Sequence, residues 1–212
     1  MSESFEQRLR SALNTRPPQR QTQRGARDAA VLIPVVERDE PALIFTVRTD
    51  TLPSHKGQIS FPGGSIDPGD VNATHTALRE AHEEIALDPD DVDIVGELDT
   101  FPTVVTGYNV TPVVGFIENR PSLTPNPAEV AAVLWVPLSE LDETTRSDPG
   151  FVHAGLSYPT EAWVWNGHVI WGVTARIIRL FLHRLSEAGL VEPPGPDPWL
   201  DWTPPQVPHE DR

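Results

Sequence analysis

The chain has 212 residues, of which 38% are hydrophobic, and its formal net charge at pH 7 is −15. This length suits one domain with irregular ends better than two full domains, since domains typically span about 100 to 200 residues. The absence of cysteine excludes disulfides, thiolate metal sites and cysteine nucleophiles. The sequence has no apolar run near the ~18 residues of a membrane span and no secretory apolar stretch at the amino terminus. A soluble, cytoplasmic protein is therefore expected.

The charge is divided unevenly along the chain. Residues 1–27 have a net charge of +4, so residues 28–212 have −19. A body this acidic repels the phosphate backbone of DNA and RNA, which excludes broad nucleic-acid binding. An anionic ligand would need a metal ion or a local group of basic side chains to neutralise it.

Composition divides the chain into a basic amino-terminal helix and linker (1–27), a central domain (28–190) and a proline-rich tail (191–212). The first part is interpreted as a solvated leader helix followed by a linker without apolar periodicity. Contact with an acidic partner and an organelle-targeting role are its alternatives. The tail contains Trp199 and Trp202, which either have no fixed place or dock on the body or on a second subunit. A homodimer therefore remains open.

Short apolar runs and turn signals predict strands and one hairpin in the central domain. The predicted strands are 29–36, 42–47, 92–97, 109–117 and 131–136. The first two are expected to pair as a hairpin across the charged stretch 37–40. Asn166-Gly167, between two aromatic-rich runs, is the strongest short hairpin signal in the chain.

Helical periodicity predicts two main helices. The first covers 71–87, with a predicted apolar stripe of Val71, Thr74, Leu78, Ala81 and Ile85. The second covers 173–190, with Thr174 as a candidate cap and Gly189 as its end. Strands mixed with two helices, without regular βαβ alternation, predict an α/β fold with a mixed sheet packed between helices.

Three carboxylates gather on the first of these helices. Glu80 and Glu84 are four residues apart and share a face, and Glu83 lies just around the helix. Crowded like charges are either solvated or hold a cation, and hard oxygen ligands suit Mg²⁺ shared with substrate phosphates. The preceding glycine turn, Phe61-Pro62-Gly63-Gly64, favours the cation, because glycine allows the turn to approach the helix closely.

Gly64, Asp70 and the run Arg79-Glu80-Ala81-His82-Glu83-Glu84 resemble the Nudix box of nucleoside-diphosphate-linked-moiety hydrolases. Three departures from the usual box are present. Asp70 replaces a Glu, one extra residue precedes Arg79, and Ala86 stands where a Gly is expected. The extra residue, with Asp67 and Asp70, is similar to the coenzyme A pyrophosphatase branch.

The segment 43–64 resembles a second signature of that branch, with Thr46, Arg48, Gly57 and Phe61–Gly64 in register. Pro53 stands where a second Arg is usual, and Thr49 replaces a Ser or Ala. Segments 105–115 and 170–175 also look like the branch, so the resemblance spans roughly residues 29–185.

The resemblance implies a Nudix-type α/β/α sandwich that binds Mg²⁺ or Mn²⁺. It implies that Glu80 and Glu84 are the principal metal ligands and that Glu83 is a further ligand or the base that orients water. Arg79 would support them by pairing with a box carboxylate, Glu83 being in reach at i+4. The implied reaction is hydrolysis of coenzyme A to 4'-phosphopantetheine and adenosine 3',5'-bisphosphate.

The resemblance also implies where the substrate binds, in residues that precede the box. These residues are Arg48, Lys56, Gly57, Phe61, Gly63 and Gly64. Arg48 is the better bidentate phosphate partner of the two basic residues. Glu129 stands where some Nudix enzymes have an auxiliary carboxylate, but it is interpreted as a surface residue. None of the histidines is given a role.

Two other functions remain open. One is hydrolysis of another nucleoside diphosphate derivative, such as ADP-ribose or NADH. The other is a ligand-binding Nudix module without catalysis, which the presence of all three glutamates disfavours.

Overall fold

The computed structural model describes residues 3–49, 57–103, 105–141, 146–147, 150–153 and 156–198. Its α-helices are α1 (Phe5–Leu13), α2 (Ala73–Ile85) and α3 (Gly172–Glu187). The central sheet is formed by β1 (Arg27–Val36), β2 (Ala42–Arg48), β3 (Ile59–Ser60), β4 (Gly63–Ser65), β5 (Asp93–Glu97), β6 (Phe101–Pro102), β7 (Tyr108–Ile117) and β8 (Val130–Pro137). Smaller strands are β9 (Arg146–Ser147), β10 (Phe151–His153), β11 (Leu156–Tyr158), β12 (Ala162–Trp165) and β13 (His168–Trp171).

The central sheet is mixed and is organised around one long parallel pair. Its main order is β3-β2-β1-β7-β5, and β4, β6 and β8 pair with β1, β7 and β2. β1 and β7 run parallel in continuous register from Arg27↔Tyr108 to Val36↔Ile117. Both strands are apolar on both faces, as a strand in the middle of a covered sheet requires.

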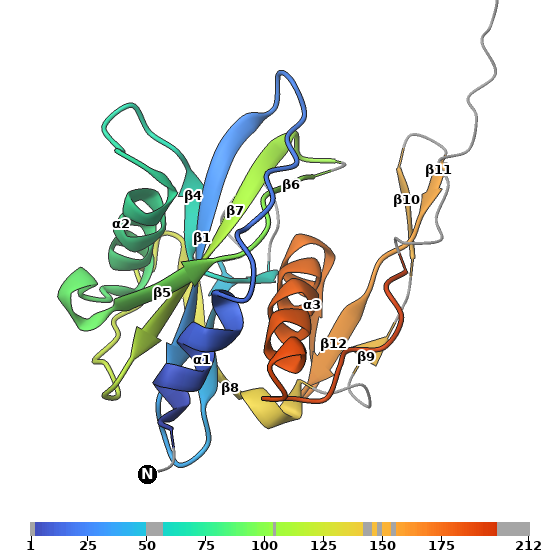
Figure 1. The fold of residues 1–212 in the computed structure, drawn as a ribbon. Coiled ribbons are helices and arrows are strands. Elements are labelled where there is room, and N and C mark those ends of the chain that lie inside the picture. The colour runs from blue at the N-terminus through green and yellow to red at the C-terminus, as the bar shows by residue number, and fades with distance from the viewer. Residues whose placement is uncertain are drawn as a thin grey trace, which may run out of the picture.

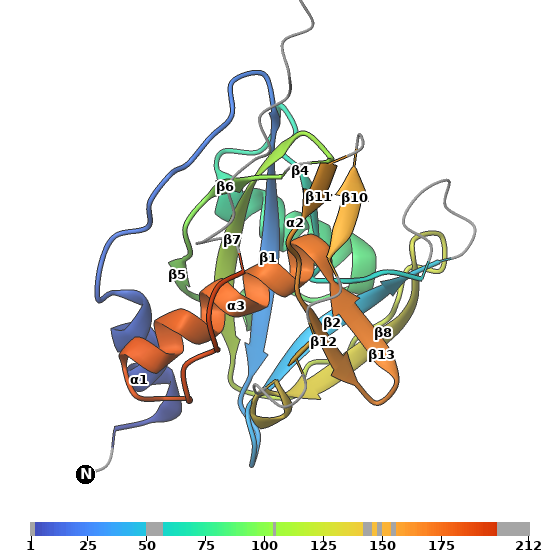
Figure 2. The same cartoon turned by 90° about the vertical axis from the view of Figure 1, so that its right-hand side faces the viewer.

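Helices cover both faces of this sheet, as Figure 1 shows. Alternate residues of β1 enter different cores: Ile33 and Val35 pack with α1 and α3, whereas Leu32 packs with α2. In Figure 2, α3 lies across the near face of the sheet and α2 lies behind it. The predicted α/β/α sandwich with a mixed sheet is therefore confirmed.

Both predicted hairpins are confirmed. β1 and β2 are antiparallel with Val35↔Leu43 and Val36↔Ala42 in register, so their hairpin is confirmed next to its turn. The rest of β1 pairs with β4 and β7, which no local pattern indicated. The hairpin of β12 and β13 is confirmed, and both turn residues, Asn166 and Gly167, have positive φ, as in a type I′ turn.

Two details of the predicted helices are wrong. α2 begins after its cap, Asn72, so Val71 lies outside the helix and is 82% exposed. Ala81 and Ile85 of the predicted stripe are buried, but the buried face also includes Ala73 and Ala77, and the predicted Thr74 is only half-buried.

The predicted cap of α3 is also wrong, although its predicted end is confirmed. Thr174 lies inside the first turn and donates its hydroxyl to the Ile59 carbonyl oxygen at 3.0 Å, while Trp171 occupies the cap position without a side-chain hydrogen bond. Gly189 follows the helix with φ +66°, the left-handed conformation that ends helices.

The amino-terminal helix is fixed to the domain, so its interpretation as a solvated leader is wrong for its inner face. Leu9, Ala12 and Leu13 are buried, and α1 contacts both α3 and β5. The acidic partner of this basic segment is the body of the same chain. Its arginines pair with carboxylates of β5 and the residues after it, namely Arg10 with Asp93, Arg20 with Glu97 and Arg16 with Asp99.

The part of the tail within the described residues lies against α3. Residues 192–198 contain neither helix nor strand, and Arg179 Nη1 donates a hydrogen bond to the Gly195 carbonyl oxygen at 2.6 Å. Trp199 and Trp202 lie outside the described residues. Within the described ranges, no helix is long and apolar enough to cross a membrane.

Candidate active site

Helix α2 carries the three predicted glutamates at different depths. The side chain of Glu80 is 17% exposed and that of Glu83 is 55% exposed, whereas Glu84 is buried. Glu84 belongs to the helix face that packs on the sheet, and Glu83 faces solvent. The i, i+3 and i+4 spacing therefore places the three carboxylates along one edge of the helix, from the core to the surface.

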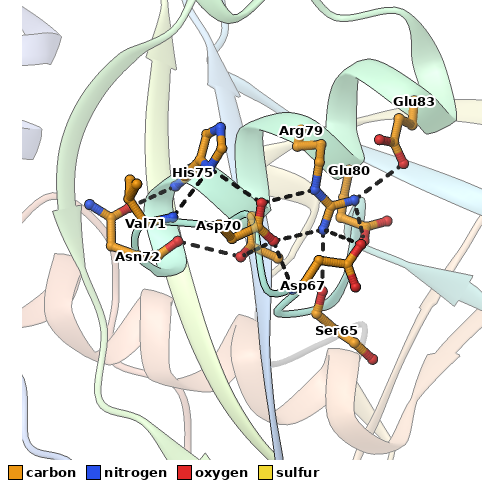
Figure 3. Close-up of polar contacts among 10 residues, drawn as sticks. Ser65, Asp67, Asp70, Val71, Asn72, His75, Arg79, Glu80 and Glu83 are labelled. Carbon is orange, nitrogen blue, oxygen red and sulfur yellow. Dashed lines mark hydrogen bonds and ion pairs between the residues drawn. The ribbon is translucent and has the colours of Figure 1, made fainter.

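Arg79 joins the predicted motif into one network, as Figure 3 shows. Its Nη1 donates to Glu80 Oε1 at 2.9 Å and to Glu83 Oε2 at 3.2 Å, so the predicted Arg79–Glu83 pair is present. Its Nε and Nη2 donate to the two oxygens of Asp70 at 3.1 and 2.9 Å, and Nη2 also donates to the Ser65 carbonyl oxygen. Arg79 thus holds two glutamates through a bidentate anchor on the preceding loop.

Asp70 is the anchor of this arginine. The Arg79 guanidinium, and then the Asp67 backbone N–H, hold the pKa of Asp70 well below its usual range. Thr76 adds a hydroxyl hydrogen bond at 2.8 Å. Asp70, the residue that departs from the usual box, is therefore bonded to Arg79 through both of its carboxylate oxygens.

Glu84 is the most perturbed carboxyl group of the site. Burial, and then the charges of Glu80 and Glu129, raise the pKa of Glu84 to about 8, against the lowering effects of Arg48 and of a hydrogen bond from the Gly63 N–H. Burial also raises the pKa of Glu80, although the hydrogen bond from Arg79 opposes it. Like charges in a buried place favour either a proton or a cation.

The glycines before α2 allow the sheet to meet these carboxylates. The predicted glycine-rich turn is wrong in form, because Gly63 and Gly64 lie in β4 and pair with Val31 and Ala30. The predicted close approach is present: a Cβ atom on Gly64 would lie 2.4 Å from Glu80 Oε1. A Cβ atom on Gly63 would lie 2.5 Å from the Ala30 carbonyl oxygen. Both positions require glycine for space.

The donor set fits a hard divalent cation. The Oε2 atom of Glu84 is buried without a hydrogen-bond partner, and Glu80 and Glu129 lie close enough to perturb its pKa. Carboxylate oxygens are the ligands that Mg²⁺ and Mn²⁺ prefer. Within the described residues, no three acidic or histidine side chains gather closely enough to hold a metal ion by themselves. The carboxylate donors suit Mg²⁺, which keeps several waters and is bound by one or two carboxylates together with substrate phosphates.

A cavity of about 920 Å³ opens beside the glycine strand. Its walls come from β1, β4 and β6, from β13 and the first turns of α3, and from the end of β2. Among the predicted substrate residues, Arg48, Phe61, Gly63 and Gly64 line this cavity. Its size is that of a site for a ligand larger than a simple phosphate.

The other predicted substrate residues are placed differently. Gly57 does not line the cavity; it has φ +67° and closes the β2–β3 connection with a hydrogen bond to the Arg48 carbonyl oxygen. Lys56 lies outside the described residues. Phe61 also belongs to the core, where it stacks on Phe45 with ring centroids 4.4 Å apart.

Sequence reasoning missed several residues of this site. Glu129, interpreted as a surface residue, contributes its charge to Glu80 and Glu84. Further polar and aromatic residues that line the cavity are Arg27, Phe101, Tyr108, Trp171 and Arg176. Of these, Tyr108 and Trp171 stand in segments that resemble the coenzyme A branch, but no spacing rule singled them out. None of the described His75, His82 and His168 lines the cavity.

The fold and this constellation define a class of protein. The chain belongs to the Nudix family, since the NUDIX domain model matches residues 26–154.

Similar proteins come from several bacteria. The chain is 41% identical over 173 residues to "Uncharacterized Nudix hydrolase NudL" of Cronobacter sakazakii, covering 81% of this chain and 90% of that protein. It is 42% identical over 154 residues to the NudL protein of Escherichia coli K12, covering 72% and 80%. A MutT/nudix family protein from Enterococcus faecalis shares the fold, with a TM-score of 0.52 and 13% identity over 87% of this chain and 70% of that one.

Proposed function

We propose that this protein is a metal-dependent hydrolase that cleaves the pyrophosphate bond of coenzyme A or its derivatives. The products are 4'-phosphopantetheine and adenosine 3',5'-bisphosphate. The observation that carries the proposal is that Gly64, which lines a large cavity, lies directly against the Glu80 carboxylate of α2. Arg48 supports it, because this side chain lines the cavity and its charge reaches Glu84.

In this proposal Glu80 and Glu84 hold Mg²⁺ or Mn²⁺, and Glu83 is a further ligand or the base that orients water. A bound cation supplies neutralisation of phosphate charge and a water of lowered pKa. The partly exposed carboxylate of Glu83 suits a base that must reach water, and its bond to Arg79 at 3.2 Å orients it. Arg79 positions Glu80 and Glu83 and does not touch the substrate.

The substrate is neutralised by the chain as well as by the cation. The cavity lies in a protein of net charge −15, so a polyanionic ligand needs local basic groups. Arg48 lines the cavity, and a guanidinium is the side chain best suited to bidentate bonds with phosphate. The glycine strand allows the diphosphate to approach the backbone closely.

The test is product analysis of the purified protein with Mg²⁺ and, separately, coenzyme A, ADP-ribose and NADH. We expect the highest kcat/KM for coenzyme A, with the two products named above. An equal or higher kcat/KM for ADP-ribose or NADH would remove the coenzyme A assignment and leave a Nudix hydrolase of another nucleotide. Binding without turnover of any of the three would leave a non-catalytic module.

Arg48→Ala tests how the substrate is held. We expect the KM for coenzyme A to rise by a larger factor than the Mg²⁺ requirement, because Glu80 and Glu84 are intact and Glu84 loses only the charge of Arg48. A rise of about tenfold or more corresponds to losing one charge-assisted hydrogen bond. An unchanged KM would exclude Arg48 from substrate binding.

A further inference from the structure

His75 lies in the first turn of α2, beside the carboxylate that anchors Arg79 (Figure 3). Its backbone N–H donates to Oδ1 of the cap residue, Asn72, at 2.8 Å. The half-exposed side chain faces the loop before the helix, where its Nδ1 atom is 3.4 Å from the Val71 backbone N and 3.2 Å from Asp70 Oδ1. The imidazole therefore stands between the end of this loop and the anchor of Arg79.

The two neighbours of this nitrogen make opposite demands on it. The Val71 N–H needs an acceptor, which Nδ1 is only when the ring carries its proton on Nε2 alone. The carboxylate oxygen of Asp70 needs a donor, which Nδ1 becomes when it carries a proton. One atom cannot do both at once. The protonation of His75 therefore determines whether the ring binds the loop backbone or Asp70.

The carboxylate of Asp70 already has a full set of donors. Arg79 Nε donates to Oδ1, and Arg79 Nη2, the Thr76 hydroxyl and the Asp67 N–H donate to Oδ2, at 2.8 to 3.1 Å. An ionised carboxylate accepts about four hydrogen bonds. The Arg79 guanidinium holds the pKa of Asp70 well below its usual range, so this group stays ionised in neutral and mildly acidic solution. Neutral His75 is thus left to accept the loop N–H, and a fifth donor to Asp70 has to compete with those present.

Protonation of His75 brings that fifth donor to the oxygen that Arg79 Nε uses. His75 Nδ1 is 3.2 Å from Asp70 Oδ1, and Arg79 Nε is 3.1 Å from the same atom. The positive ring also repels the guanidinium four residues further along the helix. The Val71 N–H at the same time loses its acceptor. All three changes weaken the bidentate bond between Asp70 and Arg79.

Few other charges act on this imidazole among the described residues. The only carboxylate besides Asp70 that approaches Arg79 from the preceding loop is Asp67, 4.0 Å from Nη2. The strands β4, β7 and β8 pack against α2 and contain no charged residue. The two charged residues of β1 contact side chains of β7 instead. The acidic turn Pro89–Asp91 follows the opposite end of the helix. The charge of the ring is therefore felt first by Asp70 and Arg79.

We propose that His75 is a positioning residue of the active site, which in its neutral form leaves Asp70 to Arg79 and on protonation loosens that bond. The catalytic consequence rests on the proposed function, in which Arg79 positions Glu80 and Glu83. Imidazole side chains change charge between about pH 5 and 8. Part of the loss of turnover in acid should therefore belong to His75.

His75→Asn and His75→Ala separate the acceptor from the proton. The Asn side-chain oxygen can take the place of Nδ1 toward the Val71 N–H, and the amide takes up no proton in this pH range. At about pH 8 the kcat of His75→Asn should match the wild type. At about pH 5.5 it should exceed the wild type by about two- to fivefold, the effect of one exposed ion pair. His75→Ala lacks the acceptor and should have a lower kcat than His75→Asn by the same factor at both pH values.

His183→Asn is the matched control. His183 of α3 also has a carboxylate partner, with Nδ1 3.4 Å from Glu187 Oε1, but it does not line the large cavity. This variant should keep the wild-type kcat at both pH values. Circular dichroism of every variant shows whether the fold is retained, and the comparison of wild type with His75→Asn decides alone where His75→Ala fails to fold. A ratio of these two kcat values that is the same at both pH values overturns the inference.

Nuclear magnetic resonance tests the same contacts without a substrate. Long-range ¹H–¹⁵N spectra at about pH 8 should show the proton of His75 on Nε2, because Nδ1 accepts the Val71 N–H. As the pH falls, the Arg79 Nε–H resonance should move together with the ring signals of His75 in the wild type and stay in place in His75→Asn.

The two measurements separate this inference from the proposed function. A neutral ring with its proton on Nδ1, or an Arg79 resonance that does not follow His75, overturns the role of His75 even in an active coenzyme A hydrolase. The expected spectra in a protein that does not hydrolyse coenzyme A support the contact with the anchor and remove the proposed reaction. Where ADP-ribose or NADH is the substrate, the kcat comparison is made with that nucleotide.

Discussion

Arg79 and its partners show how a short helical motif becomes a rigid constellation. A single guanidinium bonds to Asp70, Glu80 and Glu83 at 2.9 to 3.2 Å. Three carboxylates around one arginine would repel one another without it, because like charges at this spacing are unfavourable. Glu84 lies outside this network. Its Oε2 atom is buried without a hydrogen-bond partner, so this carboxylate, unlike those of Glu80 and Glu83, is not held by Arg79.

Glu84→Gln should lower kcat by about 10²- to 10³-fold, the usual loss for one electrostatic catalytic group. The amide keeps the volume and removes a charge that burial disfavours, so the fold should be retained. Turnover at saturating Mg²⁺ measures the expected loss of kcat, and the melting temperature measures whether the fold is retained. Glu83→Gln should behave similarly in turnover, and Glu118→Gln, an exposed residue beyond β7, is the control. Near wild-type kcat in both active-site variants would contradict the metal-site hypothesis.

Ala86→Gly should stabilise the protein. Ala86 ends α2 with φ +54°, a left-handed conformation that costs a residue with a Cβ atom about 1–2 kcal/mol. Glycine removes that strain but loses about 0.5–1 kcal/mol of chain entropy, so a net gain of about 1 kcal/mol is expected. Differential scanning calorimetry should show a melting temperature about 2–4 °C higher.

Ala188→Gly is the matched control for that change, since Ala188 ends α3 with φ −98° and carries no such strain. Ala188→Gly should not raise the melting temperature. A melting temperature of Ala86→Gly at or below that of the wild type would show that the left-handed residue is not strained.

For individual residues, the spacing along the sequence predicted the clustered carboxylates of the Nudix box but not most of the residues that line the cavity. Glu80, Glu83 and Glu84 are close in sequence, so helical geometry alone relates them. Arg27, Phe101 and Arg176 meet only through strand register and the docking of α3. No local pattern carries that information. The approach of Glu129 to Glu84 was not predicted either, because the position of Glu129 just before β8 fits a surface residue equally well.

Strand β4 and helix α2 are the pair of elements on which the site depends. β4 is only Gly63–Ser65, yet it pairs with β1 on one side and meets Glu80 on the other. The two glycines of this strand let a helix carboxylate lie directly against the sheet backbone. The two glycines have different neighbours, so they should respond differently to a methyl group.

Gly64→Ala should lower turnover strongly and the melting temperature only slightly. Gly63→Ala should lower the melting temperature more than Gly64→Ala does. At position 64 the new Cβ meets the end of the Glu80 side chain, which can move, at the expense of its bond to Arg79. At position 63 it meets the Ala30 carbonyl and the Val31 Cα atom, which are backbone atoms and cannot yield without disturbing β1. Turnover and thermal unfolding of both variants check this. Equal melting temperatures for the two would contradict it.

At the element scale, the sequence predicted most strands and both main helices, because apolar periodicity survives where an element is long. The short strands β3, β4 and β6 were not predicted, since two or three residues are too few for a period. The end of α2 was predicted within two residues, and its buried face was displaced because Val71 precedes the cap. Pairing of β1 with β7 is a long-range choice that the composition of either strand does not determine.

The charges of the whole molecule are arranged so that the basic amino-terminal segment neutralises an acidic edge of the domain. Arg16 Nη2 lies 2.6 Å from Asp99 Oδ2, and the Gln19 N–H donates to the same carboxylate. Burial alone would raise the pKa of Asp99, but these hydrogen bonds hold it below its usual value. The segment is therefore attached by a contact whose strength depends on pH.

Asp99→Asn should lower the melting temperature near neutral pH and have little effect in acid. A carboxyl group whose folded-state pKa is depressed stabilises the fold above its unfolded pKa, and this contribution disappears as pH falls through the folded value. The difference between wild type and variant should thus shrink below about pH 4, the usual pKa of Asp. Melting curves from pH 7 to 3 measure it. A difference that stays constant over this range would show that the contact does not depend on the charge of Asp99.

The buried face of α1 has a consequence for how the chain is made. Arg184 of α3 bonds to Thr15 and Arg16 across 169 and 168 residues of sequence. At about 5–20 residues per second, the ribosome finishes α3 roughly 10 to 30 s after it has released α1. Until α3 has been synthesised, α1 can pack against β5 but not against α3. Helix α1 is thus synthesised long before α3, yet it is among the last elements to reach its native packing.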